Sequence, residues 1–201
     1  DHSVAIGTWG GVARFVGAPV GLLWIDAHLD SHTPQTSPSG AIHGMPLACL
    51  LGHGDPRLLG IGIRGAQLDP LHTVVLGARS WEPEEATFLA SQGVRVIAAA
   101  EIATRGLAAC FDDALAIVDG AGHGFGITID LDAFDPSVAP GVGTPVPDGL
   151  TACEVRAGLR TLAACAGLRA LEIVEYNPRL DRHGSTAQLI GDMIGDLLPP
   201  E

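Results

Sequence analysis

Several features that mark common protein classes are scarce in this sequence of 201 residues. Aromatic residues make up only 4%, although 47% of the residues are hydrophobic, so we expect a core built from Ala, Val, Leu and Ile. Lys and Arg together number 11 against 23 acidic residues, which gives a net charge of −12. This balance argues against nucleic acid and against anionic membranes as partners, and it suits a small cationic ligand.

Cysteine and long apolar runs are also scarce. The four cysteines form no C-x-x-C pair and lie in apolar or helical contexts, so we predict buried, reduced thiols in a cytoplasmic protein. They are Cys49, Cys110, Cys153 and Cys165. No apolar run approaches the length of a membrane span, and no signal peptide opens the chain. Because the chain starts at Asp1, without an initiator Met or a lead-in strand, we interpret it as a fragment that lacks its N-terminal part.

Short apolar runs alternate along the chain with longer helical patterns. The strands are predicted at Val20–Ile25, Thr73–Leu76, Val94–Ala98, Phe125–Ile129 and Ala170–Val174. The helices are predicted at Met45–Leu51, Pro83–Gln92, Leu107–Val118, Ala152–Ala164 and Thr186–Leu198. Such alternation is typical of βαβ units, and the length suits one domain. We therefore predict a three-layer α/β/α fold with a mainly parallel sheet over residues 1–201.

Two local signals refine this picture. Thr151 and Glu154 have the spacing of a capping box, which starts a helix after Thr151. Gly and Pro concentrate after two strands, in "HTPQTSPSGAIHG" and "DPSVAPGVGTPVPDG". Open α/β folds place their ligand sites in loops at the carboxyl ends of strands, so we expect the site there.

The stretch "LLWIDAHLDSHTP" ends an apolar strand with Asp26, His28 and Asp30 in alternation. One Asp after a strand is often a turn residue or a helix N-cap, but three such side chains share one face, roughly 7 Å apart in successive pairs. They repel one another or lack partners unless a cation lies among them. A second acidic pair, Asp130 and Asp132, ends the strand in "GITIDLDAFDP".

His2, in "DHS", is a further candidate ligand. With it, the ligand-type residues exceed what one ion needs and suit two divalent cations about 3.5–4 Å apart. Oxygen ligands with some nitrogen favour Mn²⁺, while Fe, Co, Ni and Zn stay open, because ligand type alone discriminates poorly.

The motifs "DHS", "IDAHLD", "SGAIHGMPLA", "IDLDAFDP" and "LEIVEYNP" occur in the order found in the arginase (ureohydrolase) family, and the chain resembles its arginases most. The resemblance implies an arginase-like parallel α/β fold, two Mn²⁺ per chain, and hydrolysis of a small cationic guanidino substrate to urea. It also implies a homo-oligomer, either a trimer or a hexamer. L-Arginine, giving L-ornithine and urea, is the leading substrate.

The same resemblance implies roles for individual residues. The first ion would be held by His2, Asp26, Asp30 and Asp130. The second would be held by Asp26, His28, Asp130 and Asp132, so that Asp26 and Asp130 bridge. The catalytic residues would be Asp30, His43 as proton shuttle, and Glu175 as partner of the guanidinium. The alternatives are a solvent-facing His43 at a helix start and an ordinary strand-end acid at Glu175.

The sequence differs from the arginase pattern at some of the positions that bind the substrate. His32, Ser37 and Ser39 match positions that bind the substrate carboxylate, but His32 replaces an Asn there and Ala41 replaces another. Glu82 matches an acid for the substrate amino group, and Thr144 is a further substrate-binding candidate. Agmatine and 4-guanidinobutanoate therefore remain alternative substrates.

Two alternatives belong to other classes of protein. One is a catalytically inactive metal-binding member, and the other is an amide deacetylase with a single zinc. The filled ligand positions argue against the first, and the absence of a paired-His motif argues against the second. The remaining histidines are interpreted as surface residues: His53, His72, His123 and His183.

Overall fold

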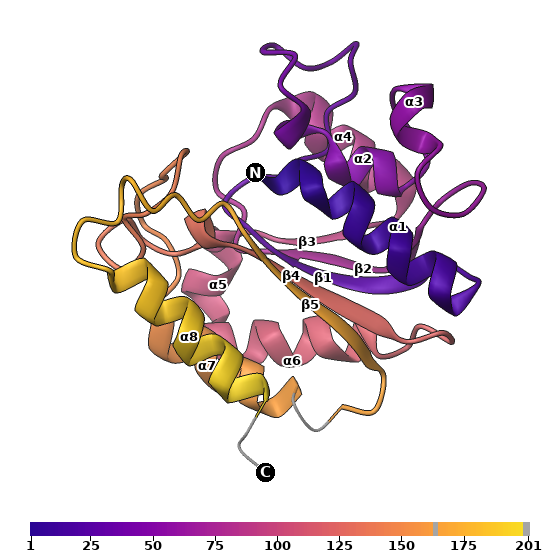
Figure 1. The fold of residues 1–201 in the computed structure, drawn as a ribbon. Coiled ribbons are helices and arrows are strands. Elements are labelled where there is room, and N and C mark those ends of the chain that lie inside the picture. Colours follow the sequence, from indigo (N-terminus) through magenta and orange to yellow (C-terminus); the bar gives the residue numbers. More distant parts are fainter. Residues whose placement is uncertain (163–164, 199–201) are drawn as a thin grey trace.

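The computed structural model describes residues 1–162 and 165–198, and its centre is a sheet of five strands (Figure 1). The strands are β1 (Val20–Ile25), β2 (Leu68–Leu76), β3 (Arg95–Ile97), β4 (Phe125–Asp130) and β5 (Leu168–Val174). They lie in the order β3-β2-β1-β4-β5, and every neighbouring pair is parallel. The predicted parallel sheet is confirmed.

Helices cover both faces of this sheet (Figure 1). One face carries α1 (Ala5–Val16), α2 (Pro46–Leu50), α3 (Pro56–Leu59) and α4 (Pro83–Gln92). The other carries α5 (Ala99–Arg105), α6 (Leu107–Val118), α7 (Ala152–Leu162) and α8 (Ser185–Leu197). Three short 3₁₀ turns, η1 (His2–Val4), η2 (Ile42–Gly44) and η3 (Leu131–Ala133), complete the described elements. This is the predicted three-layer α/β/α fold. None of the described helices is long and apolar enough to cross a membrane.

The core follows from the alternation of side chains along the strands. In β1, Leu22 and Trp24 pack with the α1 side, while Leu23 and Ile25 pack with the α6 side. All six residues of β1 are buried, as expected for a central parallel strand covered on both faces. The core also contains large aromatic side chains that the low aromatic content did not suggest: Trp9, Trp24, Phe125 and Phe134 are among its largest fully buried residues.

The predicted element boundaries hold best where local signals are strong. The predicted bounds of β1, α4 and α6 agree with the structure at both ends, whereas β2 begins at Leu68 rather than Thr73. The sequence did not predict α1, whose three glycines weaken the helical pattern, nor α5, which is only seven residues long. The predicted end of α7 at Ala164 lies outside the described residues.

The prediction of four buried thiols was wrong for two of them. All four cysteines are free, but Cys153 is exposed and Cys165 is half-buried. The reason for Cys153 is helical geometry. On α7 the buried residues are Val155, Leu159 and Leu162, and a residue two positions before Val155 points away from that stripe.

The sheet order places the ends of β1 and β4 side by side. In the parallel register Ile25 pairs with Ile129, so Asp26 and Asp130 follow at the same edge of the sheet. From β1 the chain proceeds outward through β2 and β3 and then returns to β4 on the other side of β1. Ligands of open α/β sheets bind at such a topological switch point.

Candidate metal centre

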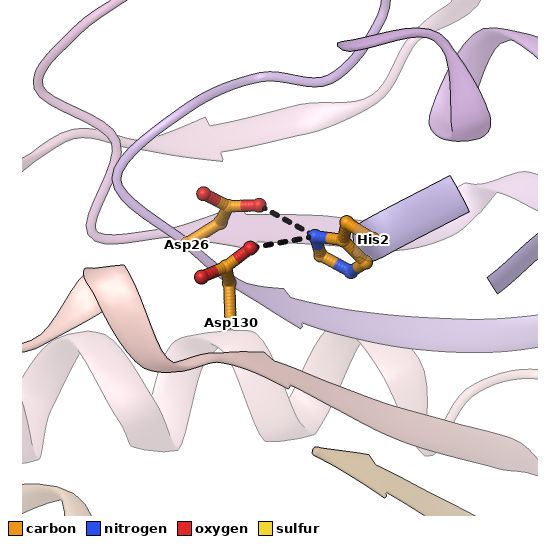
Figure 2. Close-up of side chains that lie close together, drawn as sticks. All are labelled: His2, Asp26 and Asp130. Atoms are coloured by element: carbon orange, nitrogen blue, oxygen red, sulfur yellow. Dashed lines mark ion pairs between the residues drawn. The ribbon is translucent and has the colours of Figure 1, made fainter. Parts of the chain in front are cut away.

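His2 brings its imidazole to three carboxylates at this switch point. Its Nδ1 lies 3.1 Å from an Oδ2 atom of each of three residues, which are Asp26, Asp30 and Asp130. Figure 2 shows His2 pointing this nitrogen at Asp26 and Asp130. His2 is completely buried, yet Nδ1 makes no hydrogen bond within the described residues. A buried nitrogen surrounded by acidic oxygens, none of them a hydrogen-bond partner, fits a ligand set for a cation.

A second ligand group adjoins the first and shares Asp26. His28 Nδ1 lies 3.2 Å from Asp132 Oδ2 and 3.5 Å from Asp26 Oδ1. Within each group, His2–Asp26–Asp130 and Asp26–His28–Asp132, the candidate ligand atoms lie within 4.8 Å of one another. Asp26 therefore offers one oxygen to each group. Asp130 belongs only to the first group by this geometry, and its Oδ1 accepts the backbone N–H of Asp132 at 2.8 Å.

Burial and mutual repulsion shift the acid–base behaviour of these side chains. Burial and the charge of Asp26 raise the pKa of Asp30 to about 7 and the pKa of Asp130 well above its usual range. Burial disfavours charged His28, but the carboxylates of Asp132 and Asp26 outweigh this effect and raise its pKa to about 11. The protein thus gathers more negative charge than it neutralises, and protons or cations must balance it.

A cavity of about 240 Å³ opens beside the two ligand groups. Candidate ligands and residues of the neighbouring loops line it: His28, Asp30, His32, His43, Gly44, Ser80, Glu82, Glu85, Asp130, Asp132 and Thr144. His43 is half-buried in η2, and Thr144 donates a hydrogen bond of 2.8 Å to Asp132 Oδ2. A small molecule in this cavity would contact the candidate metal ligands and His43 together.

His32 is already engaged by other side chains at the wall of this cavity. Its Nδ1 lies 3.1 Å from Thr36 Oγ1, and its Nε2 lies 3.0 Å from Glu82 Oε2 and 3.4 Å from Glu85 Oε2. His32 and Glu85 are buried, whereas Glu82 is exposed. His32, which was expected to bind the substrate carboxylate, therefore contacts two carboxylates of the protein itself.

Ser37 and Ser39 do not line the cavity. Their hydroxyl oxygens accept hydrogen bonds from the backbone N–H groups of Gly40 and Ala41, at 3.0 and 3.1 Å. Glu175 is also outside the lining. Its Oε1 accepts the backbone N–H of His2 at 2.9 Å, which places it beside the first ligand group.

Backbone conformation sets two candidate site residues apart. Asp30 and Glu175 have positive φ angles, 47° and 66°, and the one other non-Gly residue of this kind among those described is Asp148. Left-handed conformations of residues other than Gly are uncommon and cluster at functional sites, where the surrounding structure holds them.

Two residues that support the site, Arg79 and Glu85, were not predicted from the sequence. Arg79 donates to backbone carbonyls of η3 and the loop after it, among them those of Asp132, Ala133 and Val146, and so ties this loop to the end of β2. Glu85 forms a capping box with Glu82, and the E-x-x-E spacing before a helix was a readable signal for it. No local signal marked Arg79, because its acceptors in η3 and the loop after it are more than fifty positions away in sequence.

Comparisons with known proteins agree with this architecture. The model of the arginase family matches residues 1–198. The arginase of Bacillus caldovelox is 41% identical over 197 residues, which are 98% of this chain and 66% of the relative. The arginase of Brevibacillus brevis is 42% identical over 202 residues, with 98% and 67% covered. The crystal structure of arginase from Bacillus cereus superposes with a TM-score of 0.94 at 37% identity, over 100% of this chain and 69% of that chain. This chain thus spans about two thirds of the length of these relatives.

Proposed function

We propose that this chain, which belongs to the arginase family, hydrolyses the guanidinium group of a small substrate and releases urea, using two divalent cations. The observation that carries the proposal is the pair of adjoining ligand groups that share Asp26 at the switch point of the sheet. We further propose that residues 1–201 act as one domain of a cytoplasmic homo-oligomer, either a trimer or a hexamer.

The donor set suits two Mn²⁺ ions. Both groups offer carboxylate oxygens with an imidazole nitrogen, and neither contains a cysteine. The first ion would be held by His2, Asp26, Asp30 and Asp130, and the second by Asp26, His28, Asp130 and Asp132. Bound cations lower the pKa of a water molecule and polarise the group that it attacks.

Three further residues complete the chemistry in this proposal. His43 lines the cavity and would move a proton to the leaving amine, since an imidazole can both accept and donate a proton. Glu175 accepts the backbone N–H of His2 through Oε1, and its carboxylate would also accept charge-assisted hydrogen bonds from the guanidinium. Asp30, which lines the cavity as well as facing His2, accepts a hydrogen bond from the attacking water.

L-Arginine is the substrate that we favour, with L-ornithine and urea as products. Glu82 would receive the substrate ammonium group, Thr144 would contact the guanidinium end, and His32, Ser37 and Ser39 would serve the carboxylate. The contacts of His32 with Glu82 and Glu85 weaken this carboxylate site. Agmatine and 4-guanidinobutanoate, which would make the chain an agmatinase or a guanidinobutyrase, are therefore the alternatives.

Urea release by the chain of 201 residues, loaded with Mn²⁺, tests the proposal. Arginine, agmatine, 4-guanidinobutanoate and guanidine are offered in parallel, and bound metal is counted on the same sample. We expect two ions per chain and urea from at least one substrate. Two bound ions without urea would instead indicate an inactive metal-binding member, and one ion with amide hydrolysis would indicate a deacetylase.

A further inference from the structure

A hydrogen-bond chain leaves His2 from Nε2, the ring nitrogen that does not face the three carboxylates. His2 Nε2 lies 3.1 Å from Thr128 Oγ1, and this hydroxyl donates to Glu172 Oε2 at 2.8 Å. Trp9 Nε1 donates to the same carboxylate oxygen at 3.1 Å. Thr128 and Trp9 are fully buried, and Glu172 is 8% exposed. The chain links α1, β4 and β5 to the candidate metal centre through the interior of the protein.

The carboxylate of Glu172 determines which group donates in each of these hydrogen bonds. A carboxylate accepts hydrogen bonds, so the Thr128 hydroxyl uses its single proton in the hydrogen bond to Glu172. The oxygen of Thr128 can then only accept from the ring, which requires the proton of a neutral His2 to be on Nε2. This tautomer turns the lone pair of Nδ1 toward the three carboxylates of the first ligand group.

Other contacts hold the ring in this orientation. The imidazole of His2 stacks on Trp24, with ring centroids 4.1 Å apart and planes 18° apart. Trp9 reaches Glu172 because Gly126 has no side chain, since a Cβ at this position would lie 1.9 Å from Trp9 Cζ3. Glu172 Oε1 has no hydrogen-bond partner within the described residues, although it is buried. Burying an acid with an unpaired oxygen costs free energy, so an apolar residue at this position of β5 would stabilise the fold more.

We propose that Glu172 is a positioning residue of the metal centre, which acts through Thr128 to hold His2 with its Nδ1 lone pair facing the first cation. A carboxylate behind a metal-binding histidine fixes its tautomer and strengthens it as a ligand, and Thr128 extends this arrangement by one hydroxyl. The inference rests on the proposed function, because it takes the first ligand group to be a cation site. Only that group contains His2, so the effect belongs to one ion of the pair.

Titration of the metal-free chain with Mn²⁺ tests this inference through affinity rather than turnover. Thr128→Val keeps the shape of the side chain and breaks the hydrogen-bond chain, Glu172→Gln removes the charge, and Thr128→Ser keeps the hydroxyl as the matched control. We expect Thr128→Val and Glu172→Gln to weaken one of two ions by about 10–100-fold, the usual effect of removing such a partner. Thr128→Ser should stay close to wild type, and the affinity for the other ion should change little.

The outcomes separate this inference from the proposed function. If the wild type binds fewer than two ions, the binuclear centre is overturned and the inference falls with it. If the wild type binds two ions and both Thr128→Val and Glu172→Gln bind them equally well, the inference alone fails. If Glu172→Gln does not fold, the comparison of Thr128→Val with Thr128→Ser decides, and equal weakening in those two also overturns the inference.

Discussion

Asp26 is the residue that both ligand groups of the candidate metal centre share, because each of its oxygens faces a different histidine. Trp24 Nε1 donates to one of these oxygens at 2.8 Å, and the backbone N–H of His28 donates to the other at 2.7 Å. The carboxylate is therefore oriented before any cation arrives. Orientation of this kind lets a site bind a cation without rearranging its ligands.

Asp130 gives the first prediction at this scale. Asp130→Asn keeps the shape of the side chain but removes a negative charge from the first ligand group. We expect loss of at least one ion and a fall in turnover by several orders of magnitude, because the cations generate the nucleophile. Metal analysis and urea release measure both effects. Asp112→Asn on the exposed side of α6 is the control, and near-normal metal content in Asp130→Asn would contradict the assignment.

His43 should behave differently from the metal ligands. It lines the cavity but belongs to neither ligand group, so His43→Ala should keep both ions. Turnover should fall by roughly 10²-fold, the usual effect of removing a group that transfers protons. The exposed His123→Ala is the control. Unchanged turnover in His43→Ala would show that this histidine only meets solvent.

His32 bears on the choice of substrate. A site with donors for a carboxylate rejects a substrate that lacks one, and such rejection can reach ~10⁴-fold. Here His32 is paired with Glu82 and Glu85, and Ala41 offers no side-chain donor. We therefore expect a smaller preference for arginine over agmatine, about 10²-fold in kcat/KM.

Direct competition of the two substrates on the Mn²⁺-loaded protein measures this preference. If agmatine or 4-guanidinobutanoate is the better substrate, L-arginine is the wrong substrate, but the proposed hydrolysis of a guanidinium group to urea remains supported. Ser39→Ala then tells whether the loop touches the substrate, because Ser39 does not line the cavity of the free protein.

Among the elements, α4 connects helix stability to the site. Its capping box consists of Glu82 and Glu85, and both residues also contact His32 at the cavity wall. The buried Glu85 accepts the backbone N–H groups of Ser31 and Glu82, at 3.0 and 3.1 Å. One carboxylate thus caps a helix, holds the loop after β1 and contacts a site residue.

Glu85→Ala should consequently lower the free energy of unfolding. Two backbone donors lose their acceptor, and an unsatisfied buried donor costs about 1–3 kcal/mol. Urea denaturation of the metal-free protein measures this change. The neighbouring Glu84→Ala is the control, because Glu84 is exposed on the same helix turn. Equal stability of the two variants would mean that water replaces the lost acceptor without cost.

On the scale of the whole molecule, cations bound at the candidate metal centre should contribute to stability. The cluster gathers Asp26, Asp30, Asp130 and Asp132 at the junction of the two halves of the sheet, where cations offset their repulsion. Ligand that binds only the folded state adds about 4 kcal/mol at a thousandfold excess over its Kd. For a chain of this size, that corresponds to a Tm increase on the order of 10 °C.

Thermal unfolding before and after chelation measures the contribution. We expect the chelated protein to melt lower, and re-addition of Mn²⁺ to restore the Tm. The Asp130→Asn variant should respond less, since it binds less metal. An unchanged Tm on chelation would argue against cations at this cluster.

The sequence by itself determined the layers of the fold and the edge of the sheet where the site lies. Strand β1 reads directly as a buried parallel strand, and the alternating Asp26, His28 and Asp30 follow its end at Ile25. These features are local, because periodicity and i, i+2 spacing depend only on neighbours along the chain. The expectation that these three residues share one face of an extended segment was wrong, because they lie in a bent loop and Asp30 has a positive φ angle of 47°. The resemblance of the ordered motifs to the arginase family added the assignment of the candidate ligands to two ions and the roles of His43 and Glu175.

Only the tertiary structure decided which distant side chains meet. The pairing of His32 with Glu82 joins residues fifty positions apart, and the contact of Trp9 with Glu172 joins residues 163 positions apart. Both contacts depend on the strand order, and the contact of Trp9 with Glu172 also needs the space left by Gly126, which no local pattern specifies. The physical reason is that strand periodicity fixes the face on which a side chain lies, whereas the partner across that face is chosen by the packing of the whole chain.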